Sequence, residues 1–267
     1  MSQKDTDDGF TVVRGKGKRG RSRPSSKRSG RSGKTGGLYP AASATQRSTE
    51  PDADEMVEQQ LEAVAGKRDV LRRSQFHAEF VATCIPILAA FDPQETVCYG
   101  IGSLATPVSQ WQLALILLIN EKLGSRIWAY DPASTTSDIA TLEKLGVSTI
   151  TTDEGGRRRA DCRTLFFMPH CEQFLYENLL AANWTEKQLR NIALIGNHFV
   201  RYKDAQEHRL AEKAPHMDQV LPLLTVVDLP HEKLLGLRHC PYAFSDTCIQ
   251  YIPPDTRISD QVIKRSI

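Results

Sequence analysis

The chain has 267 residues, of which 40% are hydrophobic and 25% are charged, the composition of an ordinary globular protein. Its net charge of +2 is unevenly distributed: residues 9–49 carry eleven Lys or Arg and no Asp or Glu, whereas residues 50–267 sum to −7. No apolar segment follows the first methionine, and the longest apolar run (113–119) is much shorter than the roughly 18 residues of a membrane span, so we expect neither a secretory signal nor a membrane helix.

Residues 1–51 are predicted to form a disordered basic tail. The stretch 14–49 is rich in Arg, Lys, Gly and Ser and offers almost no apolar side chains whose burial could offset the entropy of ordering. Such a tail can contact nucleic acid through its charge or act as a signal for the import machinery. Base stacking needs aromatic side chains, and only Phe10 and Tyr39 flank the basic run. We therefore favour localisation or weak electrostatic association over specific nucleic-acid recognition.

Residues 52–267 are predicted to form one α/β domain. Two helical stretches, 52–74 and 74–91, come first, and strands and helices then alternate. Strands of continuous apolar character, separated by helical patterns of about a dozen residues, indicate a mostly parallel sheet covered on both faces. The expected fold is doubly wound and Rossmann-like, with an antiparallel edge near the end of the chain. The expected strands are 96–102, 126–132, 147–151, 163–170, 189–199, 224–230 and 242–252, and the expected helices between them are 107–124, 136–146, 171–184 and 216–224.

A glycine turn follows the first expected strand. Gly100, Gly102 and Ala105 satisfy the pattern G-x-G-x-x-G/A, in which the first glycine permits a tight turn and the second lets a ligand approach the backbone. The N–H groups at the start of the next helix favour a negative ligand. We place Gly100, Gly102 and Ser103 in a candidate cofactor site, although glycines of this kind also serve as simple turn formers.

Asp131, at the end of the second expected strand, is the candidate partner for ribose hydroxyls. It lies 26 residues beyond Ala105, further than the roughly 20 of the dinucleotide fingerprint. That spacing suits Rossmann domains of the S-adenosylmethionine type no worse than those that bind nicotinamide cofactors. The candidate cofactors are therefore S-adenosylmethionine or another adenine nucleotide. The alternative is that Asp131 is only an exposed cap at a strand end.

Further polar residues follow the fourth and fifth expected strands, which end at the same edge of the sheet. His170 is the candidate catalytic residue because histidine can act as acid, base or ligand, but it can equally be structural. Asn197 joins the candidate cofactor site, with His198 beside it. Asn183 is read as a helix end. No nucleophile elbow G-x-S-x-G and no pair of metal ligands at zinc spacing is present, so we expect no metal.

The six cysteines are expected to be free thiols. They show no CxxC pair and no regular framework, and several lie inside apolar runs where cysteine acts as a small hydrophobic residue. This usage fits a reducing compartment.

Seven motifs together resemble those of a known family. They are "VCYGIGSL", "SQWQLALILL", "AYDP", "TLFFMPHC", "LYENLLAANW", "IGNHF" and "AFSDTCIQYI", in this order over roughly residues 70–252. In these the chain resembles the Sensitivity to Red Light Reduced family, the SRR-like domain proteins. The family pattern has Ser where this chain has His198, which argues against a catalytic role for His198.

The resemblance implies a regulatory protein of nucleus and cytoplasm. Family members are associated with circadian clock input and red-light signalling in plants, and with clock-gene expression and heme biosynthesis regulation in animals. No settled catalytic activity or cofactor comes with the family. Two hypotheses follow: a regulatory protein that binds protein partners, or a methyltransferase-like enzyme or sensor that uses S-adenosylmethionine or a nucleotide at the glycine turn.

Overall fold

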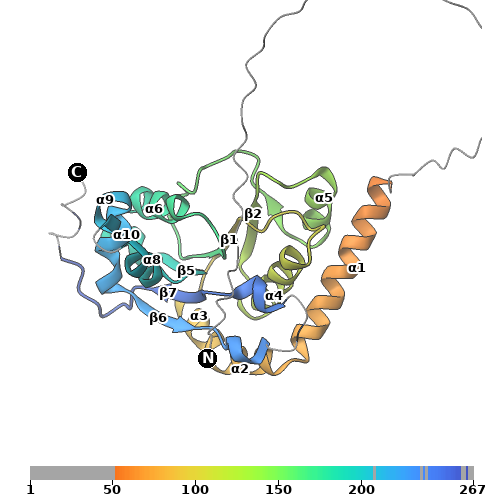
Figure 1. The fold of residues 1–267 in the computed structure, drawn as a ribbon, viewed down its shortest axis with the longest axis horizontal. Helices are drawn as coiled ribbons and strands as arrows, with labels where there is room; N and C mark the ends of the chain where they lie inside the picture. Colours follow the sequence, from red (N-terminus) through yellow and green to blue (C-terminus); the bar gives the residue numbers. More distant parts are fainter. Residues whose placement is uncertain (1–51, 207–208, 235–236, 238–239, 260–262, 264–267) are drawn as a thin grey trace, which may run out of the picture. The chain divides into compact units, whose positions relative to one another are not determined.

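The computed structural model describes residues 52–206, 209–234, 237, 240–259 and 263 (Figure 1). The tail predicted over residues 1–51 lies outside the described residues. In the described part the predicted α/β architecture is confirmed, as a seven-stranded sheet with helices on both faces.

The sheet has the strand order β3-β2-β1-β4-β5-β7-β6. The first five strands in this order run parallel, and β7 is antiparallel to both of its neighbours, β5 and β6. The predicted antiparallel edge is therefore present. The strands are β1 (Glu95–Tyr99), β2 (Arg126–Tyr130), β3 (Ser148–Thr149), β4 (Thr164–Met168), β5 (Ile192–Asn197), β6 (Thr225–Asp228) and β7 (Thr247–Tyr251).

Helices cover the two faces of this sheet (Figure 1). On one side lie α1, α4 and α5, and on the other lie α6, α8, α9 and α10. The helices are α1 (Ala53–Arg72), α2 (Gln75–Thr83), α3 (Ile85–Phe91), α4 (Pro107–Leu123), α5 (Thr136–Lys144), α6 (Gln173–Ala182), α7 (Glu186–Arg190), α8 (Phe199–Gln206), α9 (Leu210–Lys213), α10 (Pro215–Val220) and α11 (Cys240–Phe244), with 3₁₀ turns η2 (Leu221–Leu223) and η3 (His231–Leu234).

Three local predictions need correction. The helical stretch 74–91 is two helices, α2 and α3, because Pro86 lacks the N–H that would continue α2 and is instead accommodated in the first turn of α3, which begins at Ile85. The strand predicted over 242–252 is shorter, since Tyr242–Phe244 belong to α11 and the strand starts at Thr247. Helices α7, α8 and α9 were not predicted; each has only four to eight residues, too few to show a clear period.

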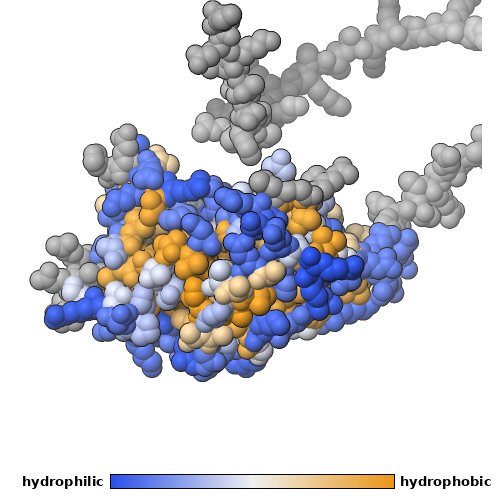
Figure 2. Space-filling view, turned by 90° about the horizontal axis from the view of Figure 1, so that it is seen from below, coloured by the Kyte–Doolittle hydropathy of each residue, from blue (hydrophilic) through white to orange (hydrophobic). Residues whose placement is uncertain are grey.

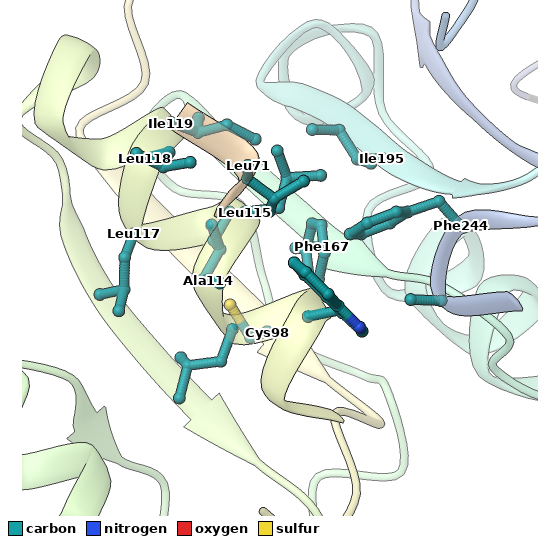
Figure 3. Close-up of a cluster of buried hydrophobic side chains, with 14 of the residues drawn as sticks. Leu71, Cys98, Ala114, Leu115, Leu117, Leu118, Ile119, Phe167, Ile195 and Phe244 are labelled. Atoms are coloured by element: carbon teal, nitrogen blue, oxygen red, sulfur yellow. The ribbon is translucent and has the colours of Figure 1, made fainter. Parts of the chain in front are cut away.

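The core consists of two apolar clusters, one on each face of the sheet. Alternate residues of β4 divide between them: Leu165 and Phe167 face α4, whereas Phe166 and Met168 face α6. Figure 3 shows Leu115 of α4, Leu71 of α1 and Phe244 of α11 gathered around Phe167. Helix α4 is apolar on nearly all sides because α1 covers the face that turns away from the sheet.

A buried carboxylate joins α1, α5 and the glycine turn. Asp138 is fully buried, and its Oδ1 accepts hydrogen bonds from Gln60 Nε2 at 2.8 Å and from the Leu104 N–H at 2.9 Å. Its Oδ2 accepts from the Thr135 N–H at 2.8 Å, which completes a capping box at the start of α5. Gln60 Oε1 in turn accepts from the Thr141 hydroxyl at 2.6 Å. These bonds place the turn after β1 relative to two helices.

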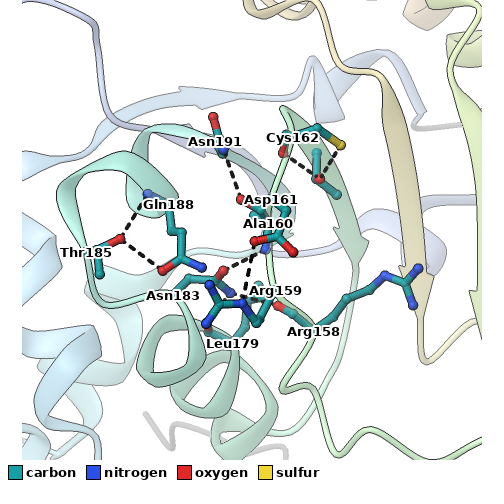
Figure 4. A network of polar contacts seen from close by, with 11 residues as sticks. Arg158, Arg159, Ala160, Asp161, Cys162, Leu179, Asn183, Thr185, Gln188 and Asn191 are labelled. Carbon is teal, nitrogen blue, oxygen red and sulfur yellow. Dashed lines mark hydrogen bonds and ion pairs between the residues drawn. The ribbon is translucent and has the colours of Figure 1, made fainter.

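The connection from β3 to β4 is a loop rather than a helix, and Asn183 holds it (Figure 4). Asn183 Oδ1 accepts from the Ala160 N–H at 2.7 Å, and its Nδ2 donates to the carbonyls of Arg158 and Leu179 at 2.8 Å each. Asn183 is the C-cap residue that follows Ala182, the last residue of α6, so its prediction as a helix end is confirmed.

Figure 2 looks at the protein from below Figure 1, onto the side where α2 lies, and shows hydrophobic side chains gathered in the middle of that face. On α3, Pro86, Ile87 and Phe91 line an apolar cavity of about 480 Å³ with the Tyr251–Pro254 segment. No single described helix is long and apolar enough to cross a membrane; the bent pair of α1 and Gln75–Phe91 meets that test only when the two are counted together.

Candidate functional site

The turn after β1 is tight, and both of its glycines are required by close contacts inside the protein. Gly100 and Gly102 have φ of +73° and +78°, in the left-handed region. A Cβ on Gly100 would lie 2.7 Å from Cys171 Sγ, and a Cβ on Gly102 would lie 2.9 Å from Ser109 Oγ. These contacts are enough to require glycine at both positions, whether or not a ligand binds there.

Asp131 directly follows β2, and its side chain lies against the turn, a contact that the sequence did not predict. Its Oδ2 accepts a hydrogen bond from the Gly102 N–H at 2.7 Å, and its Oδ1 accepts from the Ala133 N–H at 2.7 Å. The carboxylate thus takes the N–H that a ligand phosphate would use. Each carboxylate oxygen keeps a second lone pair, so Asp131 can still accept from a hydroxyl.

The start of α4 is also capped from within the protein. Thr106 is the N-cap residue, and its Oγ1 accepts from the Ser109 N–H at 3.2 Å. Ser103 Oγ accepts from the Ala105 N–H at 3.3 Å. The hydroxyls of Thr106 and Ser103 therefore satisfy two of the N–H groups expected to attract a negative ligand.

Carboxylates make the surroundings of the turn negative. Burial, followed by the charges of Asp131 and Glu172, raises the pKa of the Cys171 thiol to about 12. Desolvation, followed by the charges of Asp153 and Asp131, raises the pKa of the Tyr130 phenol. A phosphate would approach these three carboxylates against their repulsion, whereas a neutral or cationic ligand would not.

His170 is exposed and holds the turn after β4 next to α11. It has φ of +60°, and its Nε2 lies 3.2 Å from the Ala243 carbonyl oxygen, so this nitrogen carries the proton and donates. Its backbone N–H donates to Asn197 Oδ1 at 2.7 Å. These contacts give His170 a positioning role and leave its catalytic role a prediction.

Asn197, the last residue of β5, uses its whole side chain inside the protein. Besides accepting from His170, it donates from Nδ2 to the Tyr202 hydroxyl at 2.8 Å and to the Cys171 carbonyl at 3.3 Å. Asn197 thereby ties the end of β5 to the turn that follows β4. His198, the next residue, lines a cavity at the same edge of the sheet.

Tyr176 completes this junction and was not singled out from the sequence. Its hydroxyl donates to the Met168 carbonyl and accepts from the Asn197 N–H at 3.1 Å. A Cβ on Gly196 would lie 3.0 Å from the Tyr176 ring, so the ring packs directly on the backbone of β5. The position of Tyr176 on the apolar face of α6 indicates only burial, and nothing in the sequence pattern distinguishes its hydroxyl.

All six cysteines are free thiols. Burial raises the pKa of the Cys240 and Cys248 thiols to about 12, as it does for Cys171, so these groups stay protonated near neutral pH and are poor nucleophiles. Among the described residues, no three His, Cys, Asp or Glu side chains are close enough together to hold a metal ion.

Comparison with known proteins identifies one family. The model of the SRR1 domain matches residues 70–251. An SRR1-like protein of Mus musculus is 33% identical over 173 residues, which are 62% of this chain and 70% of that protein. The Arabidopsis thaliana protein SENSITIVITY TO RED LIGHT REDUCED 1 is 40% identical over 122 residues, 44% of each chain.

A third relative, an SRR1-like protein of Drosophila melanogaster, is 28% identical over 109 residues, 40% of this chain and 39% of that protein. The matched region thus spans less than half of the plant and fly relatives. No solved structure matches the chain.

Proposed function

The chain belongs to the SRR1 domain family, and from that membership we propose that it is a regulatory protein whose α/β domain binds protein partners at the carboxyl edge of its sheet. One observation carries the choice of surface. Phe174, in the first turn of α6, is 57% exposed, and Tyr242, on α11, is 72% exposed. The segments that carry them are joined by a hydrogen bond, because His170, shortly before Phe174, donates to the carbonyl of Ala243, which follows Tyr242. Exposed aromatic side chains of this kind often anchor protein interfaces.

The inward-facing polar groups support a binding role over a catalytic one. The side chains of Asp131, Asn197 and Cys171 form hydrogen bonds within the protein, to Gly102, Tyr202 and Tyr99 respectively. By the family resemblance, we further propose action in circadian clock input or light signalling, or in clock-gene and heme biosynthesis regulation, in cytoplasm and nucleus. The basic tail would contact nucleic acid or the import machinery.

Replacing Phe174 and Tyr242 together by serine should lower the recovery of protein partners at least ten-fold without unfolding the chain. Exposed substitutions rarely change stability by more than about 0.5 kcal/mol. The measurement is affinity capture of the full chain from cells with quantitative mass spectrometry. A control with Val70→Ser and Ile139→Ser removes apolar side chains that are 43% and 37% exposed on α1 and α5. Equal partner recovery by the two double variants would contradict the proposal.

A second candidate function is the binding of an adenine-containing ligand at the glycine turn. It is favoured by Asp131 at the end of β2 and by the strand order, which reverses between β1 and β4, the place where doubly wound sheets bind their ligands. Because the Gly102 N–H is already bonded and the surroundings are negative, the ligand would lack phosphates. S-adenosylmethionine, S-adenosylhomocysteine and adenosine meet this condition, whereas ATP and NAD do not.

Under this second candidate, a phosphate-free adenine ligand should raise the melting temperature of the purified full chain. Ligand at 100 times its dissociation constant stabilises a protein by about 2.7 kcal/mol. Asp131→Ala should abolish the shift, whereas Asp131→Asn, which keeps an oxygen acceptor, should retain part of it. No shift with any adenine ligand at millimolar concentration would remove this candidate. A larger shift with ATP than with adenosine would overturn the exclusion of phosphates.

A further inference from the structure

A charged cavity of about 550 Å³ lies at the carboxyl ends of β5 and β6, beyond the glycine turn along the same edge of the sheet. Doubly wound proteins bind their ligands at this edge, and the volume is in the range of small-molecule sites. Its walls come from α2, the start of α8, the segment from Asp228 to Lys233, and the turn before β7. None of the residues of the proposed adenine site lines it.

The walls of the cavity are held in place by contacts of their own. His231 Nε2 lies 2.7 Å from the Thr247 carbonyl, and the His198 N–H donates to the Asp246 carbonyl at 3.0 Å. Asp246 has φ of +58° and its Oδ1 lies 2.6 Å from Arg201 Nη1. Leu229 and Leu234, on either side of His231, are buried in the core cluster of α4. These contacts hold His198, His231 and Asp246 in the walls of the cavity.

The two histidines offer the cavity one donor and one acceptor. The Val200 N–H donates to His198 Nδ1 at 3.3 Å, so in the neutral ring the proton is on Nε2. His231 donates from Nε2 to a carbonyl, which leaves its Nδ1 as an acceptor. Within the described part of the chain, neither His198 Nε2 nor His231 Nδ1 has a hydrogen-bond partner.

The charges in the lining do not balance. Arg201 pairs with Asp246, and Lys233 lies 4.0 Å from Glu79. The remaining carboxylates, Asp228 and Glu232, form no ion pair with any described residue. With neutral histidines the lining carries two excess negative charges, so it favours a cation and disfavours an anion.

We propose that this cavity binds a small polar ligand that carries a protonated primary amine together with a hydroxyl or carbonyl oxygen. The ammonium group faces Asp228 and Glu232 and can donate to His231 Nδ1. The oxygen accepts from His198 Nε2. Such a site makes the domain a sensor of amino sugars, amino alcohols or similar amines, independently of what binds at the glycine turn.

Three sugars that differ only at carbon 6 test the proposal: 6-amino-6-deoxyglucose, glucose and glucuronate. We expect the amine to bind the full chain at least ten-fold more tightly than glucose, and glucuronate not to bind, in titrations followed by ligand-observed NMR at neutral pH. The double variant Asp228→Asn, Glu232→Gln should weaken amine binding at least ten-fold. Both side chains are exposed, so the variant should fold normally, which its melting temperature checks.

A control variant separates this site from general attraction to an acidic domain. Glu62→Gln with Asp255→Asn removes the same charge from two exposed positions outside the cavity, and it should bind the amine as the wild type does. The proposal is overturned if the control loses binding as strongly as the Asp228/Glu232 variant. Equal affinities for the three sugars, or no binding of the amine at 10 millimolar, would overturn it too.

Discussion

Replacing Asp138 by alanine should lower the free energy of unfolding by about 3–5 kcal/mol, a large part of the roughly 5–15 kcal/mol of a typical domain. The substitution leaves two buried donors without an acceptor, Gln60 Nε2 and the Leu104 N–H, and also removes the acceptor of the part-buried Thr135 N–H. A buried donor that loses its acceptor costs about 1–3 kcal/mol. Urea unfolding followed by circular dichroism measures the loss.

Asp153→Ala is the matched control for Asp138→Ala. Asp153 also accepts a backbone hydrogen bond, from the Gly155 N–H at 2.8 Å, but it is exposed and water can replace it. We expect this control to lose less than about 1 kcal/mol. If the two variants were equally stable, the buried network would not connect α1 and α5 to the turn as described.

Gly100→Ala should destabilise the protein by about 2–4 kcal/mol, and Gly124→Ala by only about 1–2 kcal/mol. Both glycines have positive φ, +73° and +67°, so both variants carry the same backbone strain. At Gly124 the added methyl group meets nothing within 4 Å, whereas at Gly100 it lies 2.7 Å from Cys171 Sγ. The difference between the two therefore measures the close approach of the β1 and β4 turns.

Thermal and urea unfolding of the two glycine variants give these numbers directly. A change of Cys171 to Ala in the Gly100→Ala background should restore part of the loss, because it removes the sulfur that the methyl group meets. If both variants lost the same free energy of unfolding, the turn would accommodate the added methyl group by a small shift, and the contact with Cys171 would not require glycine at position 100.

Much of the fold could be predicted because the strands can be recognised from short stretches of the sequence. The apolar run of β4 and the glycine after β1 are visible within a few residues, and the right-handed crossover of parallel strands then brings Gly100, Asp131 and Asn197 to one edge of the sheet. This edge is where the structure places them.

What could not be predicted is which partner each polar group takes. Gln60 and Asp138 are 78 residues apart, and nothing near either position indicates that they meet. The turn looked open to a ligand because its pattern does not reveal that Asp131 reaches the Gly102 N–H. His231 lies in an irregular segment with no period, so its approach to the cavity that His198 lines could not be foreseen either.

The position of β7 between β5 and β6 has a consequence for shortened forms of the chain. Among the described strands, β6 pairs only with β7. Because β7 is synthesised about 20 residues after β6, β6 cannot join the sheet until β7 has been made. A chain that ends before Thr247 would lack only the sequence of β7, but β6 would then have no strand to pair with, so two strands would be missing from the sheet. Such a product would expose the edge of β5, with its buried Leu194 and Ile195, to other chains and to the protein quality-control machinery.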